Sequence, residues 1–312
     1  MDFMKKLFGS NSEDKQINID PLPTDASAYN KRGCIYASEG DHDNAIADFD
    51  EAIKLEPSSA IIYNNRGSSY AAKGNFENAF LDFDKAIELD HQYADAYYGR
   101  GTAYSEKGEL DQAINDFDQA IKLDPNHASA YNNRGSTHAI KGNFDYAISD
   151  YSTAIKLNSN NADAYYFRGN AYKEIGNSSL ATSDYDKAVK LGTKHAQAYY
   201  FIGNTNASKG NYNRAIKHYT TAIELDPNFT DAYLNRGNCH NANRDFAQAI
   251  ADYDKAIEIN PNYAIAYNNR ASIYVYKRDK GHAIVDLKRA LELGLDPTNR
   301  QRAEELLKNL QR

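Results

Sequence analysis

The chain repeats itself every 34 residues, and this period constrains its fold more than any other feature. A tyrosine stands at the same place in eight successive copies, and a glycine follows four residues later in all copies but one. Repeats of this length bury their apolar faces by stacking on one another, which predicts an array of units rather than one domain around a central core. The tyrosines that set the register are Tyr29, Tyr63, Tyr97, Tyr131, Tyr165, Tyr199, Tyr233 and Tyr267.

We number the positions of each repeat from 1 to 34. The eight repeats span 26–59, 60–93, 94–127, 128–161, 162–195, 196–229, 230–263 and 264–297. Residues 1–25 precede them as an N-terminal amphipathic segment followed by a polar linker. Residues 298–312 follow them as a segment with an apolar stripe, which we expect to form a capping helix; a contact between two copies of the chain is the alternative. Both ends are too short to hold a catalytic domain.

Each repeat carries two apolar stripes with helical spacing. Positions 4, 8 and 11 are mostly Tyr, Gly and Tyr. Positions 20 and 27 are Ala in every repeat, and position 24 is aromatic in all repeats except the last, which has Leu287. These intervals of three and four residues place each set on one face of a helix. Six repeats have Gly at position 15, between the stripes, and four have Pro at position 32. Since both are typical of helix ends, each repeat is expected to be a first helix, a turn and a second helix.

This pattern resembles the tetratricopeptide repeat family. The match consists of an aromatic residue at position 4, Gly at 8, Tyr at 11, Ala at 20, an aromatic residue at 24, Ala at 27 and Pro at 32, and it covers about nine-tenths of the chain. The resemblance implies an all-α fold, namely a right-handed superhelical α-solenoid of helix-turn-helix repeats with a C-terminal capping helix. It also implies a function in binding other proteins.

One departure from the family is systematic. Position 7, which is Leu in the family, is Arg in seven repeats, and position 23 is Asp in the same seven. The remaining repeat has Ile202 and His218 at these places. Because an arginine without a carboxylate is costly at a half-buried helix contact, we infer an ion pair between the two helices of each repeat; the alternative is that both residues are solvated. The pairs join Arg32, Arg66, Arg100, Arg134, Arg168, Arg236 and Arg270 to Asp48, Asp82, Asp116, Asp150, Asp184, Asp252 and Asp286.

Positions 2, 5, 6, 9, 12 and 13 lie opposite the apolar stripe of the first helix, and in the family this side lines a concave groove. Asparagine amides there can pair with a peptide backbone, and aromatic rings can anchor a ligand. The alternative for the aromatic residues is packing between neighbouring repeats. Asp95, Asp163 and Asp231 at position 2 favour a ligand of positive or neutral polar character. The partner-binding groove is predicted to comprise Asn64, Asn65, Asn132, Asn133, Asn170, Asn204, Asn235, Asn238, Asn268, Asn269, Tyr98, Tyr166, Phe167, Tyr200 and Phe201.

The sequence shows no motif for catalysis. The eight histidines have no metal-ligand spacing, and no phosphate-binding loop, nucleophile elbow or dinucleotide fingerprint is present. His138 and His240 occupy the place of the position 11 tyrosine, where we expect them to fill the core. We therefore predict no enzyme activity, no catalytic residue, no cofactor and no metal site.

Charge and cysteine content bear on partners and location. The net charge is −7 and the pI is about 5.6, which argues against nucleic acid as a partner. The sequence contains no apolar run long enough for a transmembrane helix and no apparent signal peptide. Cys34 and Cys239 are six repeats apart, too far for a disulfide between stacked repeats, which is typical of a cytoplasmic protein.

The sequence thus predicts a cytoplasmic, non-enzymatic scaffold or adaptor that binds a protein or peptide segment in its groove. The alternative is a membrane-surface-associated assembly or targeting factor. Residues 1–8 support it, since Met1, Phe3, Met4, Leu7 and Phe8 share one side of a helical wheel, although two turns alone would bind a membrane weakly.

Overall fold

The computed structural model of the protein describes residues 24–311, so the expected amphipathic segment at residues 1–8 lies outside the described residues. The described residues form seventeen α-helices and no strand, which confirms the all-α fold. The first helices of the repeats are α1 (Ala26–Ser38), α3 (Ala60–Ala72), α5 (Ala94–Lys107), α7 (Ala128–Ile140), α9 (Ala162–Glu174), α11 (Ala196–Ser208), α13 (Thr230–Ala242) and α15 (Ala264–Tyr276). The second helices are α2 (His42–Leu55), α4 (Phe76–Leu89), α6 (Leu110–Leu123), α8 (Phe144–Leu157), α10 (Ser178–Lys190), α12 (Tyr212–Leu225), α14 (Phe246–Ile259) and α16 (Lys280–Leu293), and α17 (Pro297–Leu310) ends the chain.

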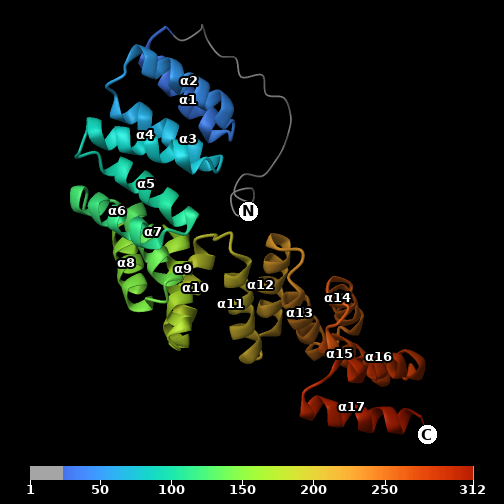
Figure 1. Cartoon of the computed structure of the whole chain (residues 1–312). Coiled ribbons are helices and arrows are strands. Elements are labelled where there is room, and N and C mark those ends of the chain that lie inside the picture. The colour runs from blue at the N-terminus through green and yellow to red at the C-terminus, as the bar shows by residue number, and fades with distance from the viewer. Residues whose placement is uncertain (1–23, 312) are drawn as a thin grey trace. The chain divides into compact units, whose positions relative to one another are not determined.

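The helices gather into two compact units. The N-terminal unit ends at Leu123 and contains α1–α6, and the C-terminal unit begins at Asp124 and contains α7–α17. Within each unit, the two helices of a repeat pack against each other, and the second helix also packs against the first helix of the next repeat. Figure 1 shows this succession of hairpins in both units.

The turn inside each repeat depends on backbone conformation. The six glycines at position 15 all have positive φ, from 73° to 87°, a region that costs other L-residues energy. In repeats 7 and 8 the same turn is made by Arg244 and Arg278, with φ of 63° and 59°. An aspartate or asparagine at position 16 then caps several of the second helices; for example, Asp41 Oδ1 accepts a hydrogen bond from the Asn44 backbone N–H at 3.2 Å.

A large ring packed against a glycine forms the core of nearly every repeat. The position 24 residue is buried in all eight repeats, and the alanines at positions 20 and 27 are fully buried beside it. A Cβ added at Gly33 would lie 2.6 Å from the Phe49 ring, so glycine at position 8 makes room for the ring. Repeat 8 differs at both positions together, since Ala271 packs in one cluster with the smaller Leu287.

The inferred Arg–Asp pair is present in all seven repeats that carry the two residues. Arg66 is representative: its Nε and Nη2 donate to the two carboxylate oxygens of Asp82 at 2.8 and 2.7 Å. The aspartates of these pairs are buried, so the two-pronged arrangement satisfies a carboxylate that water reaches poorly. The third arm, Nη1 of Arg66, reaches back to Asp50 of the preceding repeat at 2.5 Å. This link between repeats was not predicted from the sequence.

Repeat 6 replaces the ion pair with a mainly apolar contact. Ile202 is buried in a cluster with Ala181, Tyr185 and Ala198. His218 is half-buried, with its ring 6.5 Å from that of Tyr199, and burial lowers the pKa of His218 below its usual value of 6.5.

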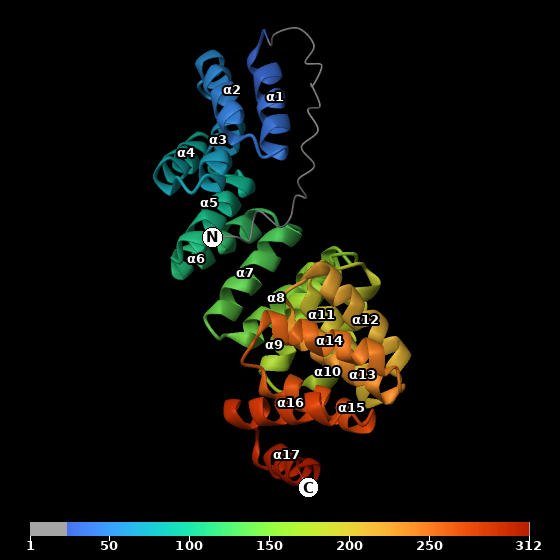
Figure 2. The ribbon, with the colours of Figure 1, turned by 90° about the vertical axis from the view of Figure 1, so that its right-hand side faces the viewer.

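Helix α17 covers the last repeat. Ala303 is fully buried in a cluster with Ala271 and Leu287, and Leu306 and Leu310 pack around them. Figure 2 shows α17 alongside α16 at the end of the chain. The apolar stripe at the C-terminus therefore shields a face of repeat 8 that would otherwise be open to water.

Candidate functional site

The amide side chains of the first helices form hydrogen-bonded rows between successive repeats. Asn235 Nδ2 donates to Asn204 Oδ1 and to the Tyr200 hydroxyl, both at 3.0 Å. Asn269 Nδ2 donates to Asn238 Oδ1 at 2.9 Å, which carries the row into repeat 8. These bonds tie positions 6 and 9 of adjacent repeats, so the asparagines link the repeats whether or not they also bind a ligand.

Buried tyrosines donate hydrogen bonds to the amides at position 9. The hydroxyls of Tyr185, Tyr219 and Tyr253, at position 24, donate to the Oδ1 atoms of Asn170, Asn204 and Asn238 at 2.6, 2.7 and 2.8 Å. Burial raises the pKa of all three tyrosines, so their hydroxyls remain donors at neutral pH. The position 9 amides are thereby fixed in orientation.

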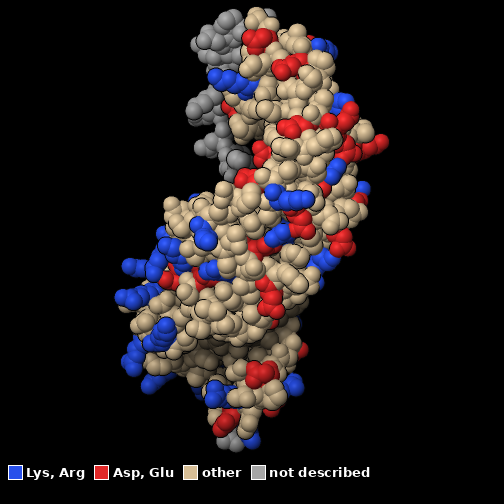
Figure 3. All heavy atoms as spheres, turned by 90° about the vertical axis from the view of Figure 1, so that its left-hand side faces the viewer, with Lys and Arg blue, Asp and Glu red and all other residues tan. Residues whose placement is uncertain are grey.

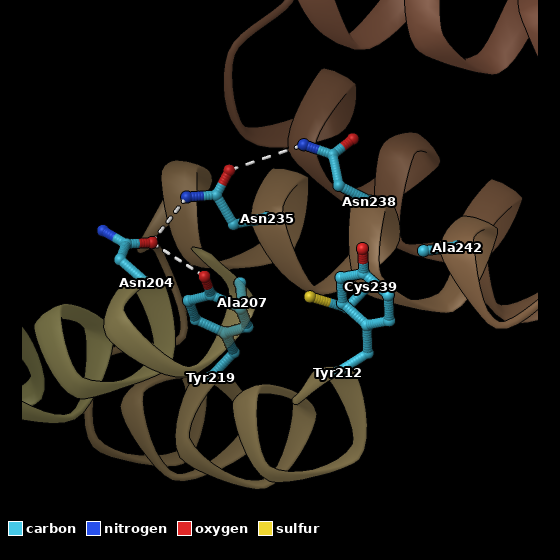
Figure 4. A pocket seen from close by; sticks show the side chains of 8 residues that line it. All are labelled: Asn204, Ala207, Tyr212, Tyr219, Asn235, Asn238, Cys239 and Ala242. Atoms are coloured by element: carbon cyan, nitrogen blue, oxygen red, sulfur yellow. Dashed lines mark hydrogen bonds between the residues drawn. The ribbon is translucent and has the colours of Figure 1, made fainter. Parts of the chain in front are cut away.

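A pocket of about 340 Å³ opens between repeats 6 and 7, and we call it the C-terminal pocket. Figure 4 shows Asn204, Asn235 and Asn238 following one another along one side, with Tyr212 and Cys239 opposite. Cys239 is a free thiol, and burial raises its pKa to about 11, which keeps it protonated and unreactive near neutral pH. None of the residues that line this pocket carries a formal charge at neutral pH.

A second pocket, of about 410 Å³, opens at the equivalent place between repeats 2 and 3, and we call it the N-terminal pocket. Asn64, Asn65 and Tyr98 of the predicted groove line it, together with Phe83, Gly99 and Glu106. Asn65 Nδ2 donates to Asn30 Oδ1 of repeat 1 at 3.0 Å. Both pockets therefore lie where the first helices of two successive repeats meet over a position 24 ring.

The aromatic residues of the middle repeats pack tightly against other rings. The Tyr166 ring stacks on His195 with a centroid separation of 3.9 Å, and Phe201 lies 4.6 Å from the ring of Tyr185. Phe167 lies 6.1 Å from Tyr151, also at position 24. All of these groove aromatics keep some exposure, so they serve as packing between repeats and still form part of the surface.

The connector at position 34 supplies site residues that the sequence analysis missed. His195 Nε2 lies 3.1 Å from Asp163 Oδ1, and this hydrogen bond lowers the pKa of Asp163. Tyr263 donates in the same way to Asp231. Asp163 and Asp231, both at position 2, thus have partners in the connector at the end of their own repeat. The one sequence signal for these position 34 contacts is the recurrence of polar or aromatic residues just before each first helix.

Most of the predicted groove residues are partly exposed. Asn64 is buried, and Asn238 is exposed. The remainder are half-buried, which leaves them within reach of a ligand: Asn65, Asn132, Asn133, Asn170, Asn204, Asn235, Asn268, Asn269, Tyr98, Tyr166, Phe167, Tyr200 and Phe201.

The two units differ in charge. Residues 24–123 contain nine Lys and Arg against nineteen Asp and Glu, a net charge of −10. Residues 124–312 contain twenty-four Lys and Arg against twenty Asp and Glu, a net charge of +4. Figure 3 shows basic side chains gathered along one flank of the C-terminal unit. Over residues 24–311, no helix has the length and apolar character needed to cross a membrane, and no group of His, Cys, Asp and Glu is arranged to hold a metal ion.

Models of the tetratricopeptide repeat, some described as TPR repeat, match the chain in overlapping segments that together span more than half of it. The matched residues are 33–74, 67–108, 94–127, 117–149, 135–176, 162–192, 203–243, 230–263 and 252–283. No match is found among curated proteins.

Several solved structures resemble the fold. YrrB, described as a TPR protein with an unusual peptide-binding site, is 28% identical, with a TM-score of 0.50 over 59% of this chain and 95% of its own. PilF of Pseudomonas aeruginosa is 18% identical, with a TM-score of 0.59 over 65% of this chain and 92% of its own. Yeast Tom70 is 19% identical, with a TM-score of 0.51 over 99% of this chain and 68% of its own.

Proposed function

Because the chain belongs to the tetratricopeptide repeat family, we propose that it is a non-enzymatic scaffold that binds an extended segment of a partner protein along the first helices of its repeats. The amide rows carry this proposal. An asparagine amide has two N–H donors and an oxygen with two acceptor positions. The Oδ1 atoms of Asn204 and Asn238 already accept two hydrogen bonds each, so the Nδ2 donors of these residues retain capacity for a ligand. Amides held in fixed orientation at regular steps suit the main-chain groups of an extended peptide.

The pockets support the same function. Both lie beside amides of the rows, so a peptide that follows the amides would pass their openings. Pockets beside a line of backbone-binding groups provide specificity for individual side chains. The peptide-binding site of YrrB, at 28% identity, is consistent with this use of the fold.

The test removes one amide from each of four repeats. The variant Asn65→Ala, Asn133→Ala, Asn235→Ala and Asn269→Ala should lose most partner capture in an affinity pulldown analysed by mass spectrometry, and its loss should be reproduced with synthetic peptides from the captured partner. A control variant removes four exposed amides of second helices: Gln112→Ala, Asn115→Ala, Gln119→Ala and Gln248→Ala. Equal capture by wild type and the first variant, with both folded, would contradict the groove assignment.

A further inference from the structure

The N-terminal pocket differs from its surroundings because of one residue. Position 6 is Asn or Phe in repeats 2 and 4–8, whereas in repeat 3 it is Gly99. At the corresponding place, Phe167 packs near Tyr151 and Phe201 packs near Tyr185. A Cβ at Gly99 would lie 2.6 Å from the Phe83 ring. The glycine therefore lets the helix approach Phe83 closely and leaves the space above it without a side chain.

The pocket combines an apolar floor with acidic walls. Phe83 and Ala103 are buried at its base. Asp95, in the first turn of α5, and Glu106, near its end, carry the charge of its walls. The residues that line it include no Lys or Arg, and it belongs to the unit with a net charge of −10. Within a surface of this sign, a cationic group gains favourable interactions with both the local carboxylates and the wider field.

A buried acceptor in the same wall points independently to a ligand. Asn64 is 9% exposed and lines the pocket, and its Oδ1 has no hydrogen-bond partner. The Asn64 amide shares a hydrogen bond with the Tyr93 hydroxyl, and burial raises the pKa of Tyr93 to about 12, so this neighbour adds no negative charge at neutral pH. Buried polar atoms nearly always have partners, so this acceptor is available to a donor that enters the pocket.

We propose that the N-terminal pocket binds a lysine or arginine side chain of the segment held in the groove. The aliphatic stem packs on Phe83 and Ala103, and the cationic head lies at the Asp95 end of the pocket on the side of Asn64, while Glu106 adds negative charge at the other end. This inference rests on the proposed function and adds to it the class of side chain recognised between repeats 2 and 3. Lys and Arg side chains suit such a site because they combine an apolar stem with a charged end.

The C-terminal pocket is an internal comparison. Four repeats further along, Asn235 stands in place of Gly99, and Ala242 stands in place of Glu106. That pocket has the same construction and no charged lining residue, so it should show no preference for a basic side chain.

The experiment selects phage-displayed random dodecapeptides on the full-length protein, sequences the bound pool and measures the affinities of synthesised peptides by fluorescence polarisation. Wild type should enrich Lys or Arg at one peptide position. The variant Asp95→Asn with Glu106→Gln should lose this enrichment and bind the best basic peptide roughly tenfold more weakly. It should bind the norleucine-substituted form of that peptide as wild type does. Ser68→Phe, which fills the pocket from an exposed lining position, should abolish the same preference.

Two controls separate the pocket from general charge and from the groove. Glu77→Gln with Glu88→Gln removes two exposed carboxylates of the same unit outside the pocket, and it should leave the enrichment unchanged. Asn235→Ala should weaken overall capture without altering the preference for basic residues. Circular dichroism melting confirms that each variant is folded.

The outcomes are distinct. Peptides selected without basic enrichment, or an enrichment that survives Asp95→Asn with Glu106→Gln, would overturn the inference and leave the proposed function standing. Failure of wild type to select any peptide would count against the proposed function, and the inference would fall with it.

Discussion

The arginine at position 7 contacts two carboxylates that differ greatly in exposure. Arg100 donates to both oxygens of Asp116 at 2.8 and 2.7 Å, and its third arm donates to Asp84 of the preceding repeat at 2.6 Å. The side chain of Asp116 is 7% exposed and that of Asp84 is 58% exposed. Removing a buried partner leaves a poorly hydrated charge alone, whereas an exposed partner is replaced by water.

This difference predicts unequal effects from two similar substitutions. Asp116→Ala should lower the free energy of unfolding by about 3 kcal/mol, because Arg100 keeps its charge at a half-buried site without its main acceptor. Asp84→Ala should lower it by less than about 1 kcal/mol. Urea denaturation followed by circular dichroism measures both. Similar losses would show that the two carboxylates contribute equally to holding the guanidinium.

His218 should make repeat 6 sensitive to mild acid. Its pKa is lowered in the folded protein by burial, so below the unfolded value of 6.5 the unfolded chain takes up the proton first. Stability should therefore be greatest above pH 6.5 and should fall as the pH drops through that value. In melting experiments at neutral pH and at pH 5, His218→Gln should reduce the difference in Tm. An unchanged difference would assign the sensitivity to other groups.

The sequence indicated some side-chain contacts and concealed others. The Arg–Asp pair could be inferred because both residues belong to the same 34-residue repeat and are replaced together at Ile202 and His218. The second carboxylate, such as Asp84 for Arg100, belongs to the preceding repeat, and only the stacking of repeats brings it close. His195 was missed for a related reason, since a helical wheel leaves out connectors and position 34 precedes the helix it contacts.

At the scale of the elements, helix pairs were predictable because each carries a short, strict pattern of small and aromatic residues. Pocket positions were not, since they depend on how closely two first helices approach. Gly99 illustrates this: its effect becomes apparent only once the Phe83 ring is seen beneath it. The same reasoning explains why Asn64 was expected in an open groove, although it proves to be buried between α3 and its neighbours.

The turns of repeats 7 and 8 offer a direct test of backbone strain. Arg244 and Arg278 adopt positive φ in the turn where earlier repeats have glycine. Arg244→Gly and Arg278→Gly should each stabilise the protein by roughly 0.5–1 kcal/mol, since relief of strain outweighs the entropy that glycine adds to the unfolded chain. The reverse change, Gly142→Arg, should destabilise by a similar amount. Calorimetric melting of the three variants would measure this, and a lower Tm for the glycine variants would contradict it.

At the scale of the whole molecule, the chain is a succession of contacts between neighbours. Within residues 24–311, packing joins each helix to those one or two places away in the sequence, and no core cluster connects distant repeats. A destabilising substitution in one repeat should therefore affect mainly the repeats next to it.

The two units also differ in net charge, −10 for residues 24–123 and +4 for residues 124–312, so they favour ligands of different charge.

Hydrogen exchange should show this local behaviour. Phe117 is fully buried in α6, and Phe117→Ala should cost its surroundings about 3–5 kcal/mol through lost contacts and a cavity. Mass spectrometry of deuterium uptake should reveal lost protection in α4, α5 and α6 and unchanged protection in α13–α16. A uniform loss along the chain would instead indicate a single cooperative unit.

The backward reach of the position 7 arginine has a consequence for how such a chain changes length. Arg66 and Arg270 reach an aspartate in the preceding repeat, and Arg168 reaches the hydroxyl of Ser152 in the same place. Because position 25 is Asp, Ser or Thr in repeats 1–7 and Lys288 only in repeat 8, insertion or deletion of one whole copy among the first seven leaves each guanidinium with an acceptor in the preceding repeat. An in-frame gain or loss of a repeat in the gene would thus leave no position 7 arginine without an acceptor where the two repeats newly meet.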